Sequence, residues 1–301
     1  MVLRGEGLHS GQPAAVTLRR APGPLAIAWP SGAVEREQLT VVRADMGVQV
    51  AGPHGERLEL VEHLMAALGA LGATEGLVVV PHPPAPSPRS WRGGGERWVQ
   101  GSSPGASGVL PLSTTVERGP GGEVPLLDGG AAVFGSALRA LGFVGGPLAG
   151  LRVLRPFSFT HGGASYELRP GAGVEVEVAI DFDHPAIGRQ RARWDGDADD
   201  FLERIAPART FGFVRDLARL QASGRAHGAR ADTALVAFGD AGPVNTALRG
   251  QDEPARHKLL DLIGDLTLYG GPLQGRVRAG RPGHAATLAM MRAARAAGAV
   301  G

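Results

Sequence analysis

The hydrophobic and polar residues of this chain follow two periods, and each period indicates one kind of secondary structure. Apolar and polar residues alternate from Ala15 to Arg19, which predicts a half-buried strand. Further extended segments are predicted at 26–29, 39–50, 77–80, 151–160, 164–169, 174–182, 234–238 and 274–279. Helical spacing of apolar residues predicts helices at 58–71, 131–141, 197–206, 213–223, 256–266 and after His284.

The order of these elements predicts an α+β protein. In each half, strands come first and an apolar helix with polar side chains comes later, without regular strand–helix–strand alternation. We therefore expect two related domains, each a two-layer sandwich of mainly antiparallel sheet packed against helices, with the active site between them. Gly145, Gly146 and Pro147 form the best linker, which gives domains 1–146 and 147–301.

The segment 81–122 does not fit either period. It holds eight prolines and nine glycines among 42 residues, and so long an irregular stretch is unusual inside a compact domain. We interpret it as an insertion into the first domain. The simplest hypothesis is a surface insert without a catalytic role.

The predicted helix 256–266 carries a polar stripe. His257 and Asp261 are four residues apart and lie on one face, and Asp265 follows one turn later. This spacing allows the two side chains to hold a divalent metal, or only to hydrogen-bond each other. Lys258 beside them is the only lysine among the 31 basic residues, which suggests that this position requires an ammonium group.

The predicted helix 58–71 contains a second ionisable group of residues. Glu62 and His63 lie in an otherwise apolar run, where burial is unfavourable unless they are paired or bind a metal. Two histidines and one aspartate would leave a fourth position open on a zinc ion, which is the arrangement of catalytic sites. A nearby glutamate suits the general base and a separate histidine suits the acid.

Composition restricts the remaining possibilities. The chain has no cysteine, so a metal must be held by His, Asp or Glu. No apolar run approaches the roughly 20 residues of a membrane span, and charged residues interrupt the start, so we expect a cytoplasmic protein without stable membrane insertion. The net charge of +2, without a dense basic cluster, argues against nucleic acid as a ligand.

Six motifs, in order along nearly the whole chain, make this sequence resemble the UDP-3-O-acyl-N-acetylglucosamine deacetylase family, the zinc amidases of lipid A biosynthesis. They are GEGLHSG at 5–11, VEHL at 61–64, DFDHPAI at 181–187, ARTFGF at 208–213, RHKLLDLIGDL at 256–266 and GHA at 283–285. The resemblance implies hydrolysis of the N-acetyl group of an acylated UDP-sugar, with release of acetate and Zn²⁺ as cofactor.

The resemblance also implies roles for individual residues. His63, His257 and Asp261 would be the zinc ligands. Glu62 would be the base, and Thr210 would help to stabilise the oxyanion. His284 would protonate the leaving amine or support the oxyanion, with Asp265 orienting it, while Lys258 would bind polar groups of the substrate.

The substrate's fatty acyl chain requires an apolar passage. The candidates are Phe211, Phe213, Leu217 and Leu220, although leucines at helical spacing are more often core residues. We expect Leu8 and His9 to face the cleft, and the segment around His184 to lie near the nucleotide. We expect the protein to be a monomer.

Three features depart from the family pattern. The family has a strand before the 5–11 loop, whereas this chain begins almost at the loop; either its start is truncated or misassigned, or the first sheet lacks an edge strand. The insertion 81–122 replaces a short connection, and Gly130 replaces the usual serine. Two alternative hypotheses stay open: an amidase acting on another N-acetylated sugar nucleotide, and a catalytically inactive ligand-binding homologue.

Overall fold

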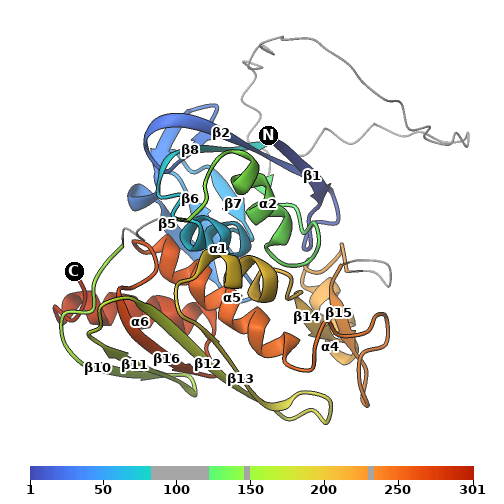
Figure 1. The fold of residues 1–301 in the computed structure, drawn as a ribbon. Helices are drawn as coiled ribbons and strands as arrows, with labels where there is room; N and C mark the ends of the chain where they lie inside the picture. The colour runs from blue at the N-terminus through green and yellow to red at the C-terminus, as the bar shows by residue number, and fades with distance from the viewer. Residues whose placement is uncertain (83–121, 146–149, 230–233) are drawn as a thin grey trace, which may run out of the picture.

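The computed structural model describes residues 1–82, 122–145, 150–229 and 234–301. Its sheets pack against helices in an α+β arrangement, which confirms the predicted fold class (Figure 1). Two helices from each half lie between the two larger sheets. The predicted domain boundary at 146/147 lies outside the described residues, so the division into 1–146 and 147–301 stays a prediction. Residues 83–121 of the predicted insertion also lie outside the described residues.

The first half is built on a five-stranded sheet and two helices. The strand order is β1-β2-β8-β3-β4, and all neighbours are antiparallel except β8 and β3. The elements are β1 (Val2–Glu6), β2 (Pro13–Pro24), β3 (Ala26–Trp29), β4 (Gly32–Glu35), the short helical turn Arg36–Gln38, α1 (Glu62–Ala70), β8 (Glu75–His82) and α2 (Ala132–Ala140).

The second half repeats this plan. Its strand order is β10-β11-β16-β12-β13, and only β16 and β12 are parallel. The elements are β10 (Phe157–His161), β11 (Ala164–Arg169), β12 (Val174–Phe182), β13 (Gly188–Trp194), α3 (Ala198–Asp200) continuing into a helical stretch at Phe201–Ile205, α5 (Glu253–Leu268), β16 (Gly275–Gly280) and α6 (His284–Ala296).

The two sheets have the same topology. In each sheet, the first two strands form an antiparallel hairpin, and the second of them lies beside the strand that comes last in the sheet's chain order, which pairs in parallel with the third strand. A helix immediately precedes that last strand, α1 before β8 and α5 before β16. The predicted relationship between the halves is therefore visible in strand order, and it makes α1 and α5 equivalent elements.

Two smaller sheets are added to this plan, with strands inserted between the fourth strand and the helix α1 or α5. In the first half, the inserted strands β5 (Thr40–Ala44), β6 (Val48–Ala51) and β7 (Arg57–Glu59) form a four-stranded sheet with β9 (Gly122–Glu123), which follows β8 in the chain. In the second half, β14 (Phe211–Phe213) and β15 (Val236–Phe238) pair in parallel and flank α4 (Val214–Ala222). These insertions supply walls of the site described below.

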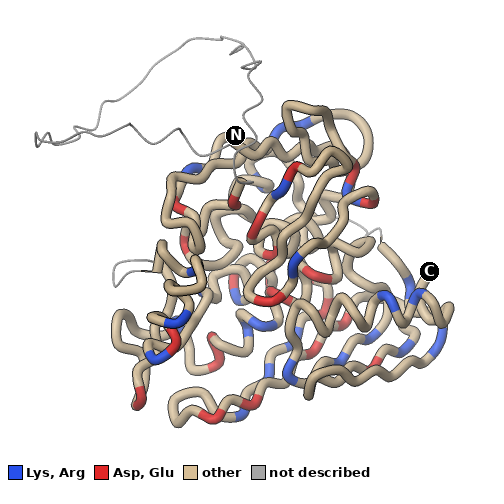
Figure 2. The backbone as a smooth tube through the Cα atoms, turned by 180° about the vertical axis from the view of Figure 1, so that it is seen from behind, with Lys and Arg blue, Asp and Glu red and all other residues tan. Residues whose placement is uncertain are grey.

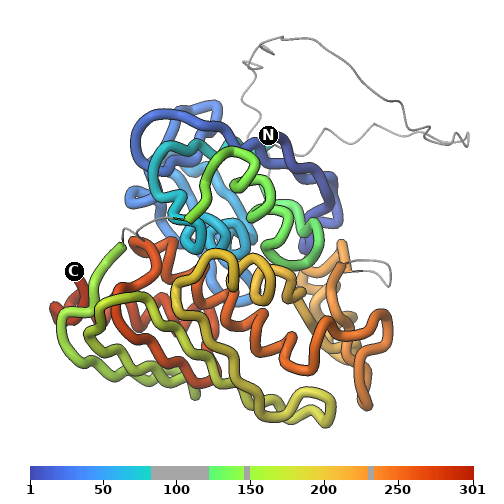
Figure 3. Tube along the Cα trace, in the orientation of Figure 1, coloured from blue at the N-terminus to red at the C-terminus, as the bar shows by residue number. Residues whose placement is uncertain are grey.

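Helices α1 and α5 cross at backbone distance. A Cβ atom on Gly264 of α5 would lie 2.0 Å from the carbonyl oxygen of Glu62, and one on Gly69 of α1 would lie 2.0 Å from Oγ1 of Thr267. Both helices are almost completely buried. The tube view shows them side by side at the centre of the molecule (Figure 3). This crossing brings the first turn of α1 against the middle of α5.

The outer face of the second sheet is charged. Arg276 and Arg278 of β16 face Glu175 and Glu177 of β12 at 3.1 and 3.5 Å. Basic and acidic residues are mixed over this sheet when the molecule is seen from behind (Figure 2). The opposite face of these strands carries the buried valines of the core, so the sheet has one solvated and one packed side.

Several predicted boundaries were wrong for identifiable reasons. The helix predicted from residue 58 begins at Glu62, because Leu60 adopts a φ of +57° and β7 pairs with β6. The strand predicted at 151–160 spans only Phe157–His161. Strand β13 was missed because its alternating positions are mainly arginine and glutamine. The first sheet does have an edge strand, because β1 pairs with β2.

Among the described residues, no helix is long and apolar enough to cross a membrane. The longest, α5, has 16 residues and contains the polar stripe recognised in the sequence.

The close helix crossing leads to a stability prediction. Replacing Gly264 with alanine should lower the free energy of unfolding by about 1–3 kcal/mol, because the added methyl group would overlap the Glu62 backbone. Without that overlap, replacing glycine with alanine inside a helix raises the free energy of unfolding by up to about 1 kcal/mol. Urea unfolding, followed by circular dichroism, measures the difference.

Gly135→Ala in α2 is the matched control. Its Cβ would first meet Cδ2 of Leu202, the end of a flexible side chain, so the variant should be neutral or slightly stabilised. Equal or greater stability of Gly264→Ala relative to the wild type would show that the crossing tolerates a side chain.

Candidate active site

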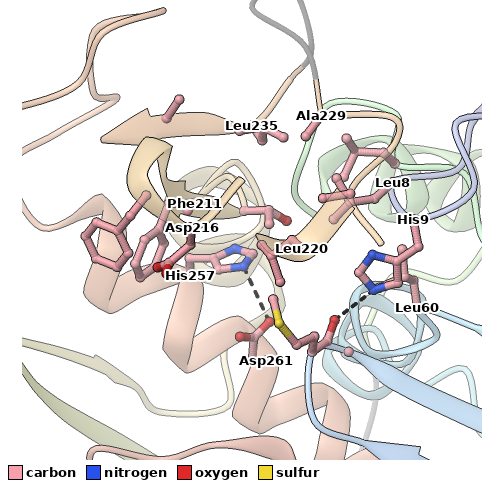
Figure 4. A pocket seen from close by; sticks show the side chains of 18 of the residues that line it. Leu8, His9, Leu60, Phe211, Asp216, Leu220, Ala229, Leu235, His257 and Asp261 are labelled. Carbon is pink, nitrogen blue, oxygen red and sulfur yellow. Dashed lines mark hydrogen bonds and ion pairs between the residues drawn. The ribbon is translucent and has the colours of Figure 1, made fainter. Parts of the chain in front are cut away.

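Three predicted metal ligands come together where α1 crosses α5. His63 lies in the first turn of α1, and His257 and Asp261 lie one turn apart on α5. Oδ1 of Asp261 is 3.6 Å from Nε2 of His63 and 3.5 Å from Nε2 of His257. In a tetrahedral zinc site with bonds of roughly 2.1 Å, neighbouring ligand atoms are roughly 3.4 Å apart. The geometry therefore fits a divalent metal ion, and Figure 4 shows the facing pair on α5.

His257 is held in the tautomer that a metal ligand requires. Its Nδ1 lies 3.1 Å from the carbonyl oxygen of Ala208, which can only accept, so Nδ1 carries the proton. Burial is the main reason that the pKa of His257 is lowered to about 4, although Asp261 acts in the opposite direction. The imidazole is therefore neutral at pH 7, with the Nε2 lone pair directed at the cluster.

Lys258 neutralises the carboxylate of the cluster. Its ammonium group donates to Oδ2 of Asp261 at 2.7 Å. Burial alone would raise the pKa of Asp261, but Lys258 and His257 hold it well below its usual range. Asp261 is therefore ionised, with Oδ1 left for a metal. The only lysine of the chain thus contacts a candidate metal ligand as well as lining the cavity.

His63 also interacts with this carboxylate. Its burial lowers its pKa, but the hydrogen bond to Asp261 and the charge of Glu62 together raise it above the ordinary value. A proton and a metal cation would therefore compete for Nε2 of His63.

Glu62 is the first residue of α1 and is buried. Its Oε2 accepts a hydrogen bond of 2.9 Å from the backbone N–H of Val48, at the start of β6. Gly47 precedes Val48, and a Cβ there would lie 3.1 Å from Oε1 of Glu62. The β5–β6 turn therefore positions the carboxylate of Glu62 next to the metal cluster.

His284 is paired with Asp265 at the N-terminus of α6. Nδ1 of His284 lies 2.9 and 3.0 Å from the two carboxylate oxygens of Asp265. Burial lowers the pKa of His284. The negative charge and hydrogen bond of Asp265, together with the charges of Asp261 and Glu62, outweigh burial and raise this pKa to about 9. His284 is therefore protonated at neutral pH. The side chain of His284 lines a cavity between the two halves, whereas Asp265 lies behind His284 and outside the cavity lining.

These groups open into one cavity of about 870 Å³ between the two halves. All of the other predicted site residues line it: Leu8, His9, Thr210, Phe211, Phe213, Leu217 and Leu220. No residue of α4 is fully buried, so Leu217 and Leu220 line the cavity and are not core residues. In Figure 4, Leu220 and Phe211 approach from one side and Leu8 and His9 from the other.

Thr210 and His9 are already engaged with backbone carbonyls. Oγ1 of Thr210 donates to the carbonyl of Gly129 at 3.1 Å, and Nε2 of His9 lies 3.0 Å from the carbonyl oxygen of Met46. The loop that carries His9 is held by Glu123, whose carboxylate accepts from the backbone N–H of His9 at 2.7 Å. The structure thus brings these predicted residues to the cavity or directly behind it, whereas His184 lies outside its lining, beside a smaller hollow.

Sequence reasoning missed two groups of residues. The β5–β6 turn contributes Asp45 and Met46 to the cavity wall, although no motif marks it. Arg209 and Glu253 form a buried ion pair of 2.8 Å beside His257. Arg209 lies within a motif quoted for the family resemblance, and an arginine next to a predicted site residue was the available signal.

Comparison with known proteins agrees with this geometry. Residues 113–295 match the model of the family described as UDP-3-O-acyl N-acetylglycosamine deacetylase (LpxC). Curated relatives named UDP-3-O-acyl-N-acetylglucosamine deacetylase, from Brucella melitensis, Brucella ovis and Brucella abortus, are each 32% identical over 292 residues, covering 94% of this chain and 88% of the relative. The similarity therefore extends over both halves.

The donor cluster predicts a metal-binding result. His63→Ala should weaken metal binding by more than the roughly 10–100-fold typical for loss of an outer hydrogen-bonding partner, because it removes a donor atom. Metal analysis after dialysis, together with competition against a chelator, measures the change. His54→Ala, on an exposed loop of the same half, should bind metal like the wild type. Full metal content in the His63 variant would rule out this site.

Proposed function

The chain belongs to the UDP-3-O-acyl N-acetylglycosamine deacetylase family, and we propose that it performs the reaction of that family with a zinc ion held by His63, His257 and Asp261. It hydrolyses the N-acetyl group of UDP-3-O-acyl-N-acetylglucosamine and releases acetate, a step of lipid A biosynthesis. The observation that carries the mechanistic proposal is the convergence of this cluster with Glu62 and His284 on one cavity.

The donor set supports zinc as the metal. Two imidazole nitrogens and one carboxylate oxygen are typical of catalytic zinc sites, which keep a position open for the substrate or water. When bound, zinc would supply Lewis acidity to the amide carbonyl and lower the pKa of water towards neutrality.

We assign the proton transfers to Glu62 and His284. The Glu62 carboxylate, fixed by the Val48 N–H, accepts the proton of the water that attacks the N-acetyl carbonyl. His284, kept protonated by Asp265, donates a proton to the leaving amine.

We assign the remaining polar groups to charge stabilisation. The Thr210 hydroxyl, which donates to Gly129, would turn to donate to the developing oxyanion. Lys258 balances the charge of Asp261 and presents its remaining N–H groups to polar atoms of the substrate.

The apolar wall of the cavity is proposed to take the acyl chain. Phe211, Phe213 and Leu217 line this wall from β14 and α4, while Leu8 and His9 line the opposite side. A smaller hollow of about 260 Å³ beside His184 adjoins Phe213 and is our candidate for the nucleotide end of the substrate. We further propose that the protein acts as a monomer in the cytoplasm.

A direct assay tests this function. Zinc-loaded protein should release acetate from UDP-3-O-acyl-N-acetylglucosamine, and faster than from UDP-N-acetylglucosamine, which has no acyl chain to fill the apolar wall. Glu62→Gln should lose about 10²–10⁴-fold in kcat while keeping its metal, because the amide cannot accept the proton.

Glu59→Gln is the control, since Glu59 lies three residues away on β7, pairs with Arg43 and does not line the cavity. Undiminished turnover by Glu62→Gln would remove Glu62 from the mechanism. Equal rates on the acylated and unacylated substrates would contradict the acyl passage.

The histidine–aspartate pair predicts a pH effect. His284 must be protonated to act as the acid, so kcat/KM should fall as the pH rises through the pKa of His284, which lies at about 9. Asp265→Asn removes the carboxylate that raises this pKa, and the alkaline limb should move to lower pH. Asp45→Asn, which lines the same cavity but pairs with Arg225, should leave the limb in place. An alkaline limb unmoved in Asp265→Asn would contradict the assigned role.

A further inference from the structure

The peptide bond between Ala208 and Arg209 is bound at both of its polar ends. Its carbonyl oxygen accepts from Nδ1 of His257 at 3.1 Å. Its N–H donates to Oε1 of Glu253, also at 3.1 Å. A continuous chain of hydrogen bonds therefore runs from the Glu253 carboxylate through one peptide unit to a candidate metal ligand.

Glu253 is held in place by several donors. It is 1% exposed and lies in the first turn of α5, four residues before His257. Arg209 donates to its two oxygens at 2.8 and 3.0 Å, and the backbone N–H of Arg249 donates to Oε2. Burial alone would raise the pKa of Glu253, but Arg209 and these N–H groups lower it. The carboxylate is therefore ionised.

Arg209 fixes the other end of this arrangement. Its guanidinium also donates to Oγ1 of Thr246 at 3.0 Å and to the carbonyl of Ala247 at 2.7 Å. The segment before β14 is thus clamped to the start of α5, and the carbonyl of Ala208 cannot turn away from His257 without also turning the N–H of Arg209 away from Glu253.

The chemical consequence concerns the basicity of His257. A hydrogen bond from a peptide N–H to a carboxylate polarises the peptide and makes its carbonyl oxygen a stronger acceptor, since linked hydrogen bonds strengthen one another. A stronger acceptor at Nδ1 makes Nε2 a better donor to a metal, and it fixes the orientation of the ring.

We propose that Glu253 is a positioning residue for the metal site. Through the Ala208–Arg209 peptide it holds His257 in its binding tautomer and raises the affinity of the site for zinc. This inference rests on the proposed function only in assuming that His257 binds the metal. If Glu253 served only to anchor α5, its loss would change stability and leave metal affinity unchanged.

Glu253→Gln tests the proposal, because it keeps the shape of the side chain and removes its charge. The zinc dissociation constant, measured by chelator competition on the folded protein, should rise about 10-fold or more. The matched control is Asp252→Asn, which breaks the 2.9 Å pair of Asp252 with Arg256 at the same helix end without touching the Ala208–Arg209 peptide. Its zinc affinity should equal that of the wild type.

The outcomes separate the possible failures. Zinc affinity of Glu253→Gln equal to that of Asp252→Asn would overturn the positioning role and leave the proposed function intact. Absence of zinc binding by the wild type would overturn both. If Glu253→Gln does not fold, Glu253→Asp keeps the charge but withdraws the carboxylate from the peptide N–H. It should also bind zinc more weakly, and unchanged affinity in that variant would overturn the proposal.

Discussion

The close crossing of α1 and α5 is the constraint on which the site depends. Gly264 allows α5 to touch the backbone of Glu62, and this contact places His63 beside His257 and Asp261. Burying ionisable groups is unfavourable unless they are paired, and most of these groups find partners within one half: Lys258 with Asp261, His284 with Asp265, and Glu62 with the backbone N–H of Val48. The contact of His63 with Asp261 joins the two halves, so the three candidate ligands meet only when the halves are packed together.

The environment gives two histidines opposite properties. Burial is the main reason that the pKa of His257 is lowered to about 4; His63 and Lys258 lower it further, while Asp261 and the Ala208 carbonyl act in the opposite direction. His284 faces the carboxylate of Asp265, which raises its pKa to about 9. Such a separation of pKa values suits the roles proposed for His257, a neutral metal ligand, and His284, a protonated acid. Helix α5 contributes to both environments, because its polar stripe supplies Lys258 and Asp265 as well as the candidate ligands His257 and Asp261.

Local patterns predicted much of the fold, because apolar residues recur at every second position in strands such as β12 and at helical spacing in α5. They failed where tertiary contacts decide, as in β13, whose arginines pair with glutamates of β12. The His-x-x-x-Asp spacing identified two of the three candidate ligands, and the ionisable pair in the apolar run 58–71 suggested His63, almost 200 residues earlier, but their individual roles came only from the family resemblance. The positioning of His257 by Glu253 passes through a backbone carbonyl, which no side-chain pattern encodes.

The internal repeat explains how the cavity is divided. The equivalent helices α1 and α5 supply the three candidate metal ligands, so the geometry of the cluster follows from the duplicated plan itself. The walls for the substrate come mainly from the inserted elements, which differ between the halves: a turn between antiparallel strands in the first, and β14 with α4 in the second. Because α4 has no fully buried residue, its apolar side chains can change without loss of core packing. If this wall binds the acyl chain as proposed, selection for another chain can act on it while the candidate metal cluster stays fixed.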